Sequence, residues 1–154
     1  MNELTIFAAV PSPLGTLYLC EEDGALSRIS CDCPDGTEGT SPLLREAAKQ
    51  LDEYFLGERK DFDLPLAAHG TPFQMRVWQA LRAIPYGETR TYAQIAAAAG
   101  SPKAFRAVGQ ANHVNPLMIV VPCHRVVGAD GSLTGYAYGM ENKKKLLALE
   151  KAHR

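Results

Sequence analysis

The chain has 154 residues, of which 46% are hydrophobic and 21% are charged, and its formal net charge is −1. This length is enough for one ordinary domain or for two small ones. Because no run of about 18 consecutive apolar residues occurs and the first residues lack the basic flank of a signal peptide, we exclude a membrane-spanning helix and expect a cytoplasmic, intracellular protein.

The charge is divided unevenly along the chain. Residues 1–70 hold 5 Lys and Arg against 13 Asp and Glu, whereas residues 71–154 hold 11 against 4. A basic half of this kind is expected where a protein neutralises phosphates. The alternative is a solvated lysine-rich helix surface, which Lys143, Lys144 and Lys145 could form on their own.

Residues 1–69 predict a small α/β domain. Segments 5–10, 15–21 and 25–31 are rich in apolar and β-branched residues and are separated by Gly- and Pro-containing turns, the pattern of short antiparallel strands. A polar loop over 32–40 follows. The next element is a helix that begins at Ser41–Pro42, ends at Gly57 and carries an apolar stripe of Leu43, Ala47, Leu51 and Phe55. Residues 60–66 could return as an edge strand.

Four cysteines, Cys20, Cys31, Cys33 and Cys123, do not look like a disulfide framework in a chain of this size. The first three are the right ligand type for a structural zinc ion, and His69 could complete a tetrahedral set. Their spacing matches no recognised zinc finger, and Cys20 and Cys31 fall at strand ends, where a buried cysteine is ordinary. We therefore favour burial and expect no metal and no cofactor.

Residues 70–154 predict a helical domain. Thr71–Pro72 begins its first helix, which carries an apolar stripe of Phe73, Val77, Leu81 and Ile84, with Trp78 as a further core residue. A capping box at Thr91–Gln94 opens a helix over 92–99, Gly100 closes it, and Ser101–Pro102 begins another that runs to about Asn112. Two short helices joined by one or two residues form a helix-turn-helix, which alone is weak evidence for DNA binding.

The second helix of this pair carries Lys103 and Arg106 among Ala104, Ala107 and Gly109. Small residues let a helix approach a surface closely, and Arg106 could reach into a groove or between bases. Ordinary helix packing through the alanines is the alternative.

The stretch that most strongly indicates chemistry is Pro122–Cys123–His124–Arg125, after the apolar run 117–121, which we interpret as a buried extended segment. A cysteine is nucleophilic as its thiolate, and a neighbouring imidazole and guanidinium lower a thiol pKa. A lone cysteine is usually a packing residue. With His124 and Arg125 beside it, Cys123 is the better candidate for a nucleophile.

Three further features follow Cys123. Asp130–Gly131 predicts a hairpin turn between Val126–Val127 and Leu133. The loop 135–139 is bounded by glycines, which let backbone amides come close to a ligand. A final helix over 140–152 carries Glu150 among leucines, and if this carboxylate is buried it needs a partner such as a histidine.

These motifs together carry a resemblance: Asn115–Pro116, Pro122–Cys123–His124–Arg125–Val126, Gly135–Tyr136–Ala137 and Leu146–Glu150. The sequence resembles the alkylguanine-DNA alkyltransferases, also called methylated-DNA-protein-cysteine methyltransferases. The likeness is close over about residues 71–152 and looser at Ser12–Gly15. It implies an α+β fold, with a small N-terminal α/β domain and a C-terminal helical domain that contains a winged-helix-like helix-turn-helix. The implied activity is single-turnover transfer of an alkyl group from the guanine 6-oxygen in DNA to the cysteine.

The resemblance also implies roles for individual residues. Cys123 would accept the alkyl group, His124 would relay the thiol proton through a water, and Glu150 would orient the histidine. Asn115 would hold the active-site turn against the helix-turn-helix, and Tyr92 would hydrogen-bond the flipped base. The remaining residues implied in substrate or DNA binding are Arg106, which would fill the gap left by the base, Ala137, whose amide would face the guanine oxygen, and Lys103, Ala107, Tyr136 and Tyr138. The expected partner is double-stranded DNA containing alkylated guanine, contacted in the minor groove by a monomer.

Two residues depart from the family pattern. Tyr138 stands where a small residue is usual, which suggests a narrowed alkyl pocket that accepts methyl and handles benzyl poorly. Phe105 also replaces a small residue, and the sequence leaves open whether it wedges into DNA or packs inward. Two other classes stay open at this point: a Cys-His hydrolase with Glu150 as the orienting group, and a non-catalytic helix-turn-helix or damage-binding protein, against which the presence of Cys123 argues.

Overall fold

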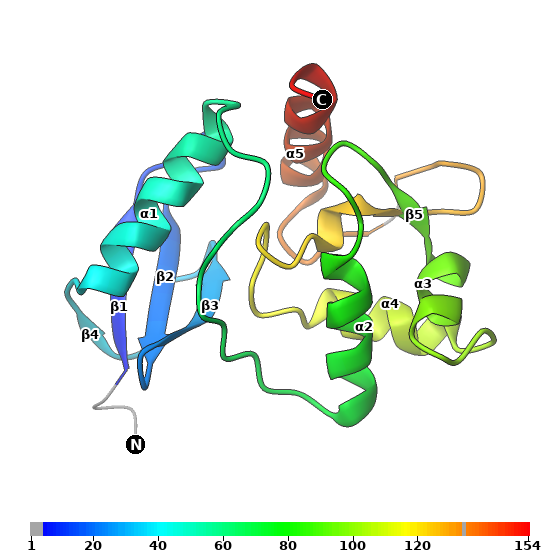
Figure 1. The fold of residues 1–154 in the computed structure, drawn as a ribbon, viewed down its shortest axis with the longest axis horizontal. Helices are drawn as coiled ribbons and strands as arrows, with labels where there is room; N and C mark the ends of the chain where they lie inside the picture. The colour runs from blue at the N-terminus through cyan, green and yellow to red at the C-terminus, as the bar shows by residue number, and fades with distance from the viewer. Residues whose placement is uncertain (1–4, 134) are drawn as a thin grey trace. The chain divides into compact units, whose positions relative to one another are not determined.

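The computed structural model of the chain describes residues 5–133 and 135–154. The chain divides into two compact units, Met1–Ala68 and His69–Arg154, each of which is described by itself (Figure 1). Within the described ranges, no helix is both long and apolar enough to cross a membrane.

The N-terminal unit is built on a four-stranded sheet of β1 (Ile6–Val10), β2 (Leu17–Glu22), β3 (Ala25–Ser30) and β4 (Thr37–Glu38), in the order β3-β2-β1-β4. The antiparallel pairing of β1, β2 and β3 confirms the three predicted strands. The pairing of β4 with β1 is parallel, so the sheet is mixed, and β4 lies inside the stretch predicted as a loop. Its two residues are polar and exposed, so the sequence lacks the alternation of apolar and polar residues that would predict a strand there.

The predicted edge strand at residues 60–66 does not form. Leu66 makes one isolated parallel bridge to Leu26, with hydrogen bonds from Leu26 N to Pro65 O and from Ala67 N to Leu26 O. The segment carries Lys60, Asp61 and Asp63, and both residue types have low strand propensity.

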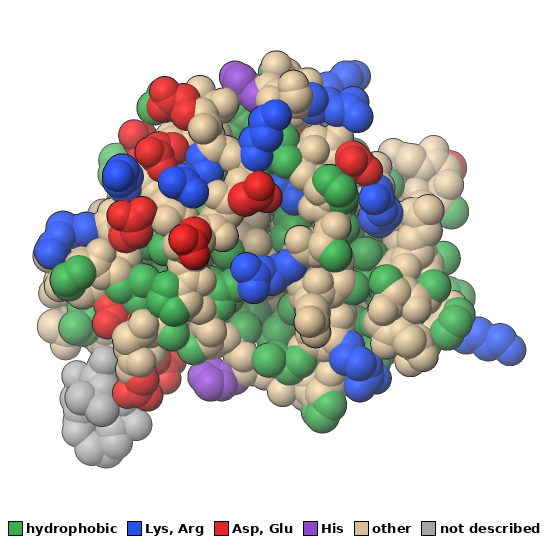
Figure 2. Space-filling view, in the orientation of Figure 1, with side chains coloured by type: hydrophobic (Ala, Val, Ile, Leu, Met, Phe, Trp, Pro, Cys, Tyr) green, Lys and Arg blue, Asp and Glu red, His purple; other side chains and the backbone are tan. Residues whose placement is uncertain are grey.

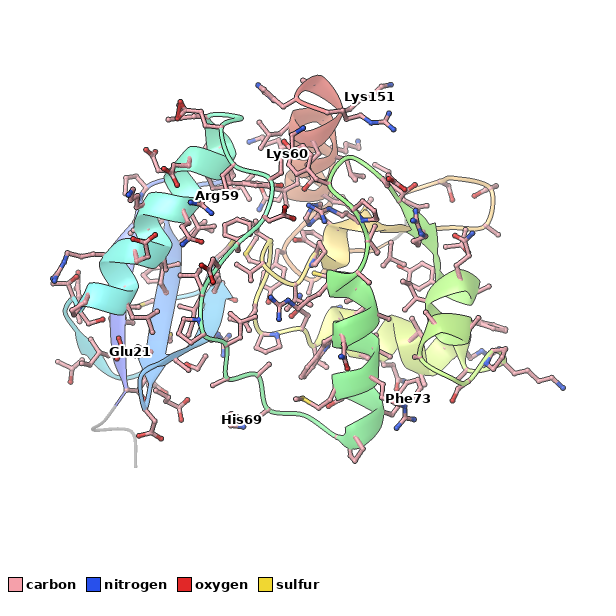
Figure 3. The ribbon with its side chains drawn as sticks, in the orientation of Figure 1. Glu21, Arg59, Lys60, His69, Phe73 and Lys151 are labelled. Carbon is pink, nitrogen blue, oxygen red and sulfur yellow. The ribbon has the colours of Figure 1, made fainter. Side chains whose placement is uncertain are left out.

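One face of this sheet is covered by α1 (Pro42–Phe55) (Figure 1). Ser41 accepts a hydrogen bond from Leu44 N at 3.1 Å and also donates to Glu21, whose position Figure 3 marks. The buried stripe is Leu44, Ala47, Leu51 and Tyr54. It is therefore rotated from the predicted stripe, since Leu43 and Phe55 are only half-buried.

Three cysteines belong to the N-terminal unit, and all four cysteines of the chain are free thiols. Cys20 is buried in β2, Cys31 is half-buried just after β3, and Cys33 is exposed. His69 lies on the segment before the first helix of the other unit (Figure 3). Across the part of the chain that the structure describes, no three His, Cys, Asp or Glu residues are grouped so that they could hold a metal ion. Metal analysis of the purified protein tests the zinc hypothesis directly.

The described residues of the C-terminal unit form the α-helices α2 (Pro72–Arg82), α3 (Tyr92–Ala98), α4 (Phe105–His113) and α5 (Met140–Ala152). The helix α2 begins at Thr71–Pro72, as predicted, and the structure adds a capping box between Thr71 and Gln74. The α2 residues Val77, Trp78 and Leu81 are buried, and Trp78 Nε1 donates to Ala111 O at 2.9 Å, which ties α2 to α4. Phe73, at the N-terminal end of α2 in Figure 3, is only half-buried.

The helix-turn-helix consists of α3 and α4. Its first helix begins with the predicted Thr91–Gln94 capping box and is followed by Gly100, whose φ of +83° requires glycine. Its second helix begins at Phe105, later than predicted, because residues 101–104 form a turn in which Ala104 N donates to Ser101 O at 2.9 Å. The connection is therefore longer than the expected one or two residues.

The apolar run 117–121 is buried, but it is not an extended strand. Val121 N donates to Leu117 O and Val120 N donates to Met118 O, so the run folds into tight turns. Ile119 has a φ of +73°, a left-handed conformation that is strained for a β-branched residue. A short apolar run has the same pattern in a buried strand and in a buried turn, so the sequence could not separate the two.

The segment after this turn joins the small two-stranded sheet of β5 (Arg90–Thr91) and β6 (Val126–Val127), which pair in parallel. The predicted turn at Asp130–Gly131 forms, with Gly128 N donating to Ser132 O at 2.9 Å. The predicted hairpin was wrong, since the described pairing of β6 is with β5 and not with Leu133.

Candidate active site

Cys123 begins a short 3-10 helix, η2 (Cys123–Arg125), and its side chain is fully buried. Its backbone is held on two sides: Cys123 N donates to Val121 O at 2.8 Å, and Asn112 Nδ2, from α4, donates to Cys123 O at 3.3 Å. Asn115 stabilises the preceding turn, because its Nδ2 donates to Val121 O at 2.8 Å and its Oδ1 accepts from Leu117 N at 3.0 Å. The turn and α4 together fix the position of the thiol.

Burial is the dominant influence on the Cys123 thiol and raises its pKa to about 11. Hydrogen bonds from the side chains of Asn115 and Tyr136 and the positive charge of Lys143 lower the pKa and offset part of that effect. The thiol is thus protonated at rest at neutral pH. The sequence suggested that His124 and Arg125 lower the pKa of this thiol directly. Instead, both side chains contact Glu150.

Glu150 is the centre of a buried charged cluster beside Cys123. His124 Nε2 lies 2.6 Å from Glu150 Oε2, and Arg125 contacts both carboxylate oxygens, with Nε 2.8 Å from Oε1 and Nη2 3.0 Å from Oε2. Arg125 Nη1 also donates to Ile84 O at 2.7 Å, and Gly87 N donates to Oε1 at 3.3 Å. Because His124 is 0% exposed and Glu150 is 1% exposed, both groups are shielded from bulk solvent.

The protonation states follow from these contacts. Burial lowers the pKa of His124 and so favours its neutral form. For Glu150, burial alone would raise the pKa, but the hydrogen bonds from His124 and Arg125 and the positive charge of Arg125 outweigh it and lower the pKa to about 2. An ionised carboxylate accepts the proton of Nε2, which leaves the lone pair of a neutral histidine on Nδ1. Within the described residues, Nδ1 has no hydrogen-bond partner, so it is the nitrogen that can accept a proton.

Lys143 does not belong to a solvated lysine surface, which the sequence had left open as an alternative. Its side chain is fully buried, and Nζ donates to Val126 O at 2.6 Å. Burial lowers its pKa, and the neighbouring Cys123 opposes this shift. A cation therefore lies within electrostatic range of the thiol.

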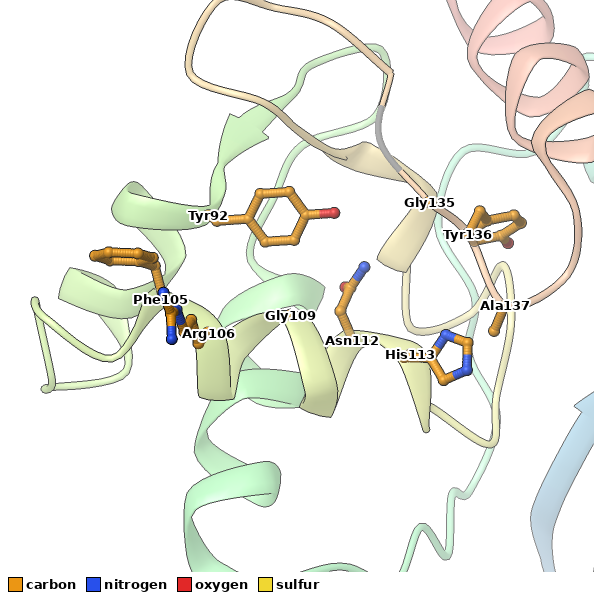
Figure 4. Close-up of a pocket in the computed structure, with 9 residues that line it drawn as sticks. All are labelled: Tyr92, Phe105, Arg106, Gly109, Asn112, His113, Gly135, Tyr136 and Ala137. Atoms are coloured by element: carbon orange, nitrogen blue, oxygen red, sulfur yellow. The ribbon is translucent and has the colours of Figure 1, made fainter.

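A pocket of about 560 Å³ is lined in part by residues that contact Cys123 (Figure 4). It is lined by residues of α3, of α4 and of the loop before α5: Tyr92, Phe105, Arg106, Gly109, Asn112, His113, Gly135, Tyr136 and Ala137. Two of these residues connect it to the nucleophile, since Asn112 donates to the Cys123 carbonyl and Tyr136 hydrogen-bonds the thiol. Figure 4 shows the Tyr92 ring directed from α3 towards the loop that carries Tyr136.

The two-stranded sheet links the pocket to the nucleophile. In the β5–β6 pairing, Thr91 lies opposite Val127, four residues after Cys123. Thr91 caps α3, whose first residue is Tyr92. The backbone that carries Cys123 thus also sets the position of the first turn of the helix-turn-helix.

Tyr138 stabilises the loop behind the pocket. Its hydroxyl donates to Asn115 O, and its ring lies 5.4 Å from the ring of Tyr136 at an interplanar angle of 65°. Asn142 Nδ2 donates to Tyr138 O at 2.8 Å. Tyr138 is not among the residues that line the described pocket, so it acts on the pocket wall through Tyr136.

Two family models match the chain: the DNA-binding domain of 6-O-methylguanine DNA methyltransferase over residues 72–152, and the ribonuclease-like domain of the same family over residues 6–68. The chain belongs to the 6-O-methylguanine DNA methyltransferase family. A methylated-DNA-protein-cysteine methyltransferase of Bacillus subtilis is 50% identical, with 96% of both chains covered, and one of Methanosarcina acetivorans is 49% identical over 94% of this chain and 97% of its own.

Solved structures of this methyltransferase family agree with the fold. The crystal structure of Mycobacterium tuberculosis O6-methylguanine methyltransferase superimposes with a TM-score of 0.90 at 43% identity, covering 97% of this chain and 94% of that one. A structure of Mycobacterium tuberculosis OGT in complex with DNA also has a TM-score of 0.90, at 45% identity, covering 96% and 94%. The predicted α+β fold is confirmed.

In this family member, the structure brings together Cys123, His124, Glu150, Asn115 and Tyr136, and places Tyr92, Arg106 and Ala137 in the adjoining pocket. The two other residues expected on the DNA-binding surface, Lys103 and Ala107, are exposed and do not line that pocket. Lys103 instead borders a shallow hollow together with Ser101, Pro102 and Ala104.

Sequence reasoning missed Asn112, Lys143 and the contact of Arg125 with Glu150. A usable signal existed for Lys143, because it shares a helical stripe with the buried residues Leu146 and Glu150. Asn112 similarly follows the buried positions Val108 and Ala111 on α4. Nothing in the sequence could have revealed the contact of Arg125, which depends on how α5 packs beside η2.

Proposed function

We propose that this protein repairs DNA by transferring a methyl or other small alkyl group from the 6-oxygen of guanine to Sγ of Cys123, once per molecule. The observation that carries the proposal is the buried Cys123 beside the cluster of His124, Glu150 and Arg125, next to a pocket lined by the helix-turn-helix. Family membership supports the same reaction.

The first step is removal of the thiol proton. Because the resting thiol has a pKa of about 11, it needs a base when the substrate is in place. Nδ1 of neutral His124 serves as that base through a bridging water, and Glu150 stabilises the imidazolium that forms. The side chains of Asn115 and Tyr136 and the charge of Lys143 stabilise the thiolate.

In the second step, the sulfur–carbon bond forms while the bond between carbon and the guanine 6-oxygen breaks. The electron pair of the broken bond leaves with the guanine, which takes up a proton and returns to the ordinary base. Tyr92 hydrogen-bonds the extruded base, and the backbone amide of Ala137 faces its oxygen. The product is a thioether with no easy route back, so the protein is consumed.

The proposed partner is double-stranded DNA, contacted in the minor groove by one copy of the chain. A duplex buries the guanine 6-oxygen in base pairing, so the base must be extruded at a cost of a few kcal/mol. Arg106 fills the gap, the small exposed face of α4 around Ala107 permits close approach, and Lys103 contacts a phosphate. The Mycobacterium tuberculosis relative solved with DNA supports this partner.

A titration tests the proposal. The protein is mixed with increasing amounts of duplex DNA that carries one radiolabelled O6-methylguanine, and the label bound to protein is counted. We expect a plateau at one methyl per protein molecule, and no transfer in Cys123→Ser. Continued turnover, or hydrolysis of ester substrates, would instead favour a Cys-His hydrolase. DNA affinity retained in Cys123→Ala with no transfer by the parent would favour a non-catalytic binding protein.

A further inference from the structure

Phe105 is a large aromatic side chain that the fold leaves in solvent. It is the first residue of α4, and its side chain is 53% exposed. The sequence left open whether this phenylalanine packs inward, and the exposure excludes that role. A single exposed apolar residue is ordinary on a protein surface, so a binding role for Phe105 has to be argued from the residues around it.

The surroundings of Phe105 are cationic. Lys103 and Arg106 flank it and are both exposed. Between Thr89 and Met140 the sequence contains one acidic residue, Asp130. On the viewed face, acidic side chains lie mainly over the N-terminal unit (Figure 2). An aromatic ring interleaved with cations, on a stretch of chain with a single acidic residue, suits the stacked bases and phosphates of a nucleic acid.

Phe105 also lies at the end of the pocket that is farther from Cys123. Phe105 and Arg106 both line the pocket, at the N-terminal end of α4, whereas Asn112 lines it and contacts Cys123 (Figure 4). Asn112 lies seven positions after Phe105 on α4, which is about 10 Å along the helix axis. Phe105 is therefore at the outer end of the pocket, where the duplex would lie when an extruded base reaches the thiol.

Arg106 alone does not occupy this outer end. Consecutive residues of a helix point in directions about 100° apart, so Phe105 and Arg106 reach different positions. A base that leaves the stack exposes the faces of its neighbours, and an aromatic ring can cover such a face whatever the sequence.

We propose that Phe105 is a second DNA-contacting wedge: its ring stacks on a base next to the gap left by the extruded guanine, while Arg106 occupies the gap itself. This inference rests on the proposed function. It makes Phe105 a positioning residue that stabilises the extruded state of the duplex and takes no part in the chemistry at sulfur. Since stacking releases no counterions, its contribution to affinity is independent of salt, unlike a phosphate contact.

The test compares Phe105→Ala and Phe105→Leu with the parent. Met75→Ala is the matched control, because Met75 is a large apolar residue on α2 that is 44% exposed and does not line the pocket. The rate of methyl transfer to Cys123 is measured with duplex DNA containing one O6-methylguanine and with the free modified base. Duplex affinity is measured over a range of salt, with Lys103→Ala for comparison, and 2-aminopurine next to the lesion reports unstacking.

We expect Phe105→Ala to weaken duplex binding and slow duplex transfer about tenfold, with a far smaller effect on the free base. Phe105→Leu should be intermediate, and Met75→Ala should match the parent. The slope of log Kd against log salt should stay unchanged in Phe105→Ala and fall by about one in Lys103→Ala.

Normal duplex transfer in Phe105→Ala overturns the wedge, as does equal slowing on duplex and free base, or an equal loss in Met75→Ala. If the parent protein transfers no methyl group at all, the proposed function fails instead, so the two failures are distinguishable.

Discussion

Replacing Arg125 with methionine removes the guanidinium that holds both oxygens of Glu150 while keeping much of the apolar bulk. In the parent, Arg125 is 6% exposed and Glu150 is 1% exposed, and three nitrogen–oxygen contacts of 2.7–3.0 Å hold the arginine to Glu150 and to Ile84 O. In the variant the carboxylate keeps His124 and Gly87 N as the partners described above. Removing one side of a buried ion pair costs about 3–5 kcal/mol, a large part of the roughly 5–15 kcal/mol that typically stabilises a protein.

The same substitution should change the chemistry. The positive charge of Arg125 is one of the influences that lower the pKa of His124, after burial itself. Without it, the uncompensated carboxylate raises that pKa, and more of the histidine is imidazolium at neutral pH. An imidazolium has no lone pair on Nδ1, so the acidic limb of the pH–rate profile should move to higher pH. Arg125→Lys keeps the charge but cannot bridge both oxygens, so it should be intermediate.

Urea unfolding followed through the fluorescence of Trp78, the one tryptophan of the chain, measures the stability loss. Single-turnover methyl transfer measured between about pH 5 and 8, where histidine titrates, measures the shift. An Arg125→Met protein with the parent's unfolding midpoint and the parent's pH profile would refute the view that Arg125 holds the Glu150–His124 pair.

Three further predictions concern other parts of the site. The pKa of Glu150 is lowered from 4.5 to about 2, so the ionised carboxylate stabilises the fold by about 3 kcal/mol above pH 4.5, and this stabilisation is lost as the pH falls towards 2. The free energy of unfolding of Glu150→Gln should therefore lack this dependence on acid pH. If the variant kept the parent's dependence, Glu150 would not be its source. Arg106→Ala should slow transfer from duplex DNA far more than from the free modified base, and equal effects in the two assays would sink its role in filling the gap. Tyr138→Gly should speed reaction with benzylated guanine, because the Tyr138 ring supports Tyr136 in the pocket wall; rapid benzyl transfer by the parent would show that Tyr138 does not restrict the alkyl group.

Local signals in the sequence predicted the elements whose ends are set by neighbouring residues. Ser41–Pro42, Thr71–Pro72 and the capping box at Thr91 predicted three helix starts, because each of these side chains bonds a backbone amide within its own first turn. The start of α4 was missed since Ala104 provides no side-chain cap and the Ser101–Pro102 signal serves a turn.

Long-range pairing explains the other differences. Two polar residues become β4 because β1 offers an unpaired edge, and Val126–Val127 pair with Arg90–Thr91 across a long stretch of chain. The sequence around Cys123 was enough to identify the nucleophile, but it did not predict the pKa of the thiol or the groups that set it. The thiol pKa is set mainly by burial, and Lys143 and Glu150 come from α5, whose position beside η2 no local pattern describes.

The central claim is that Cys123 is the alkyl acceptor, and peptide mass spectrometry tests it most directly. The protein is incubated with duplex DNA containing O6-methylguanine, digested, and mapped over all four cysteines, with Cys123→Ser as the control. We predict one added methyl group on Cys123 in an amount equal to the guanine repaired, and none on Cys20, Cys31 or Cys33. Repaired DNA together with an unmodified Cys123 peptide, or a methyl group on another cysteine, would contradict it.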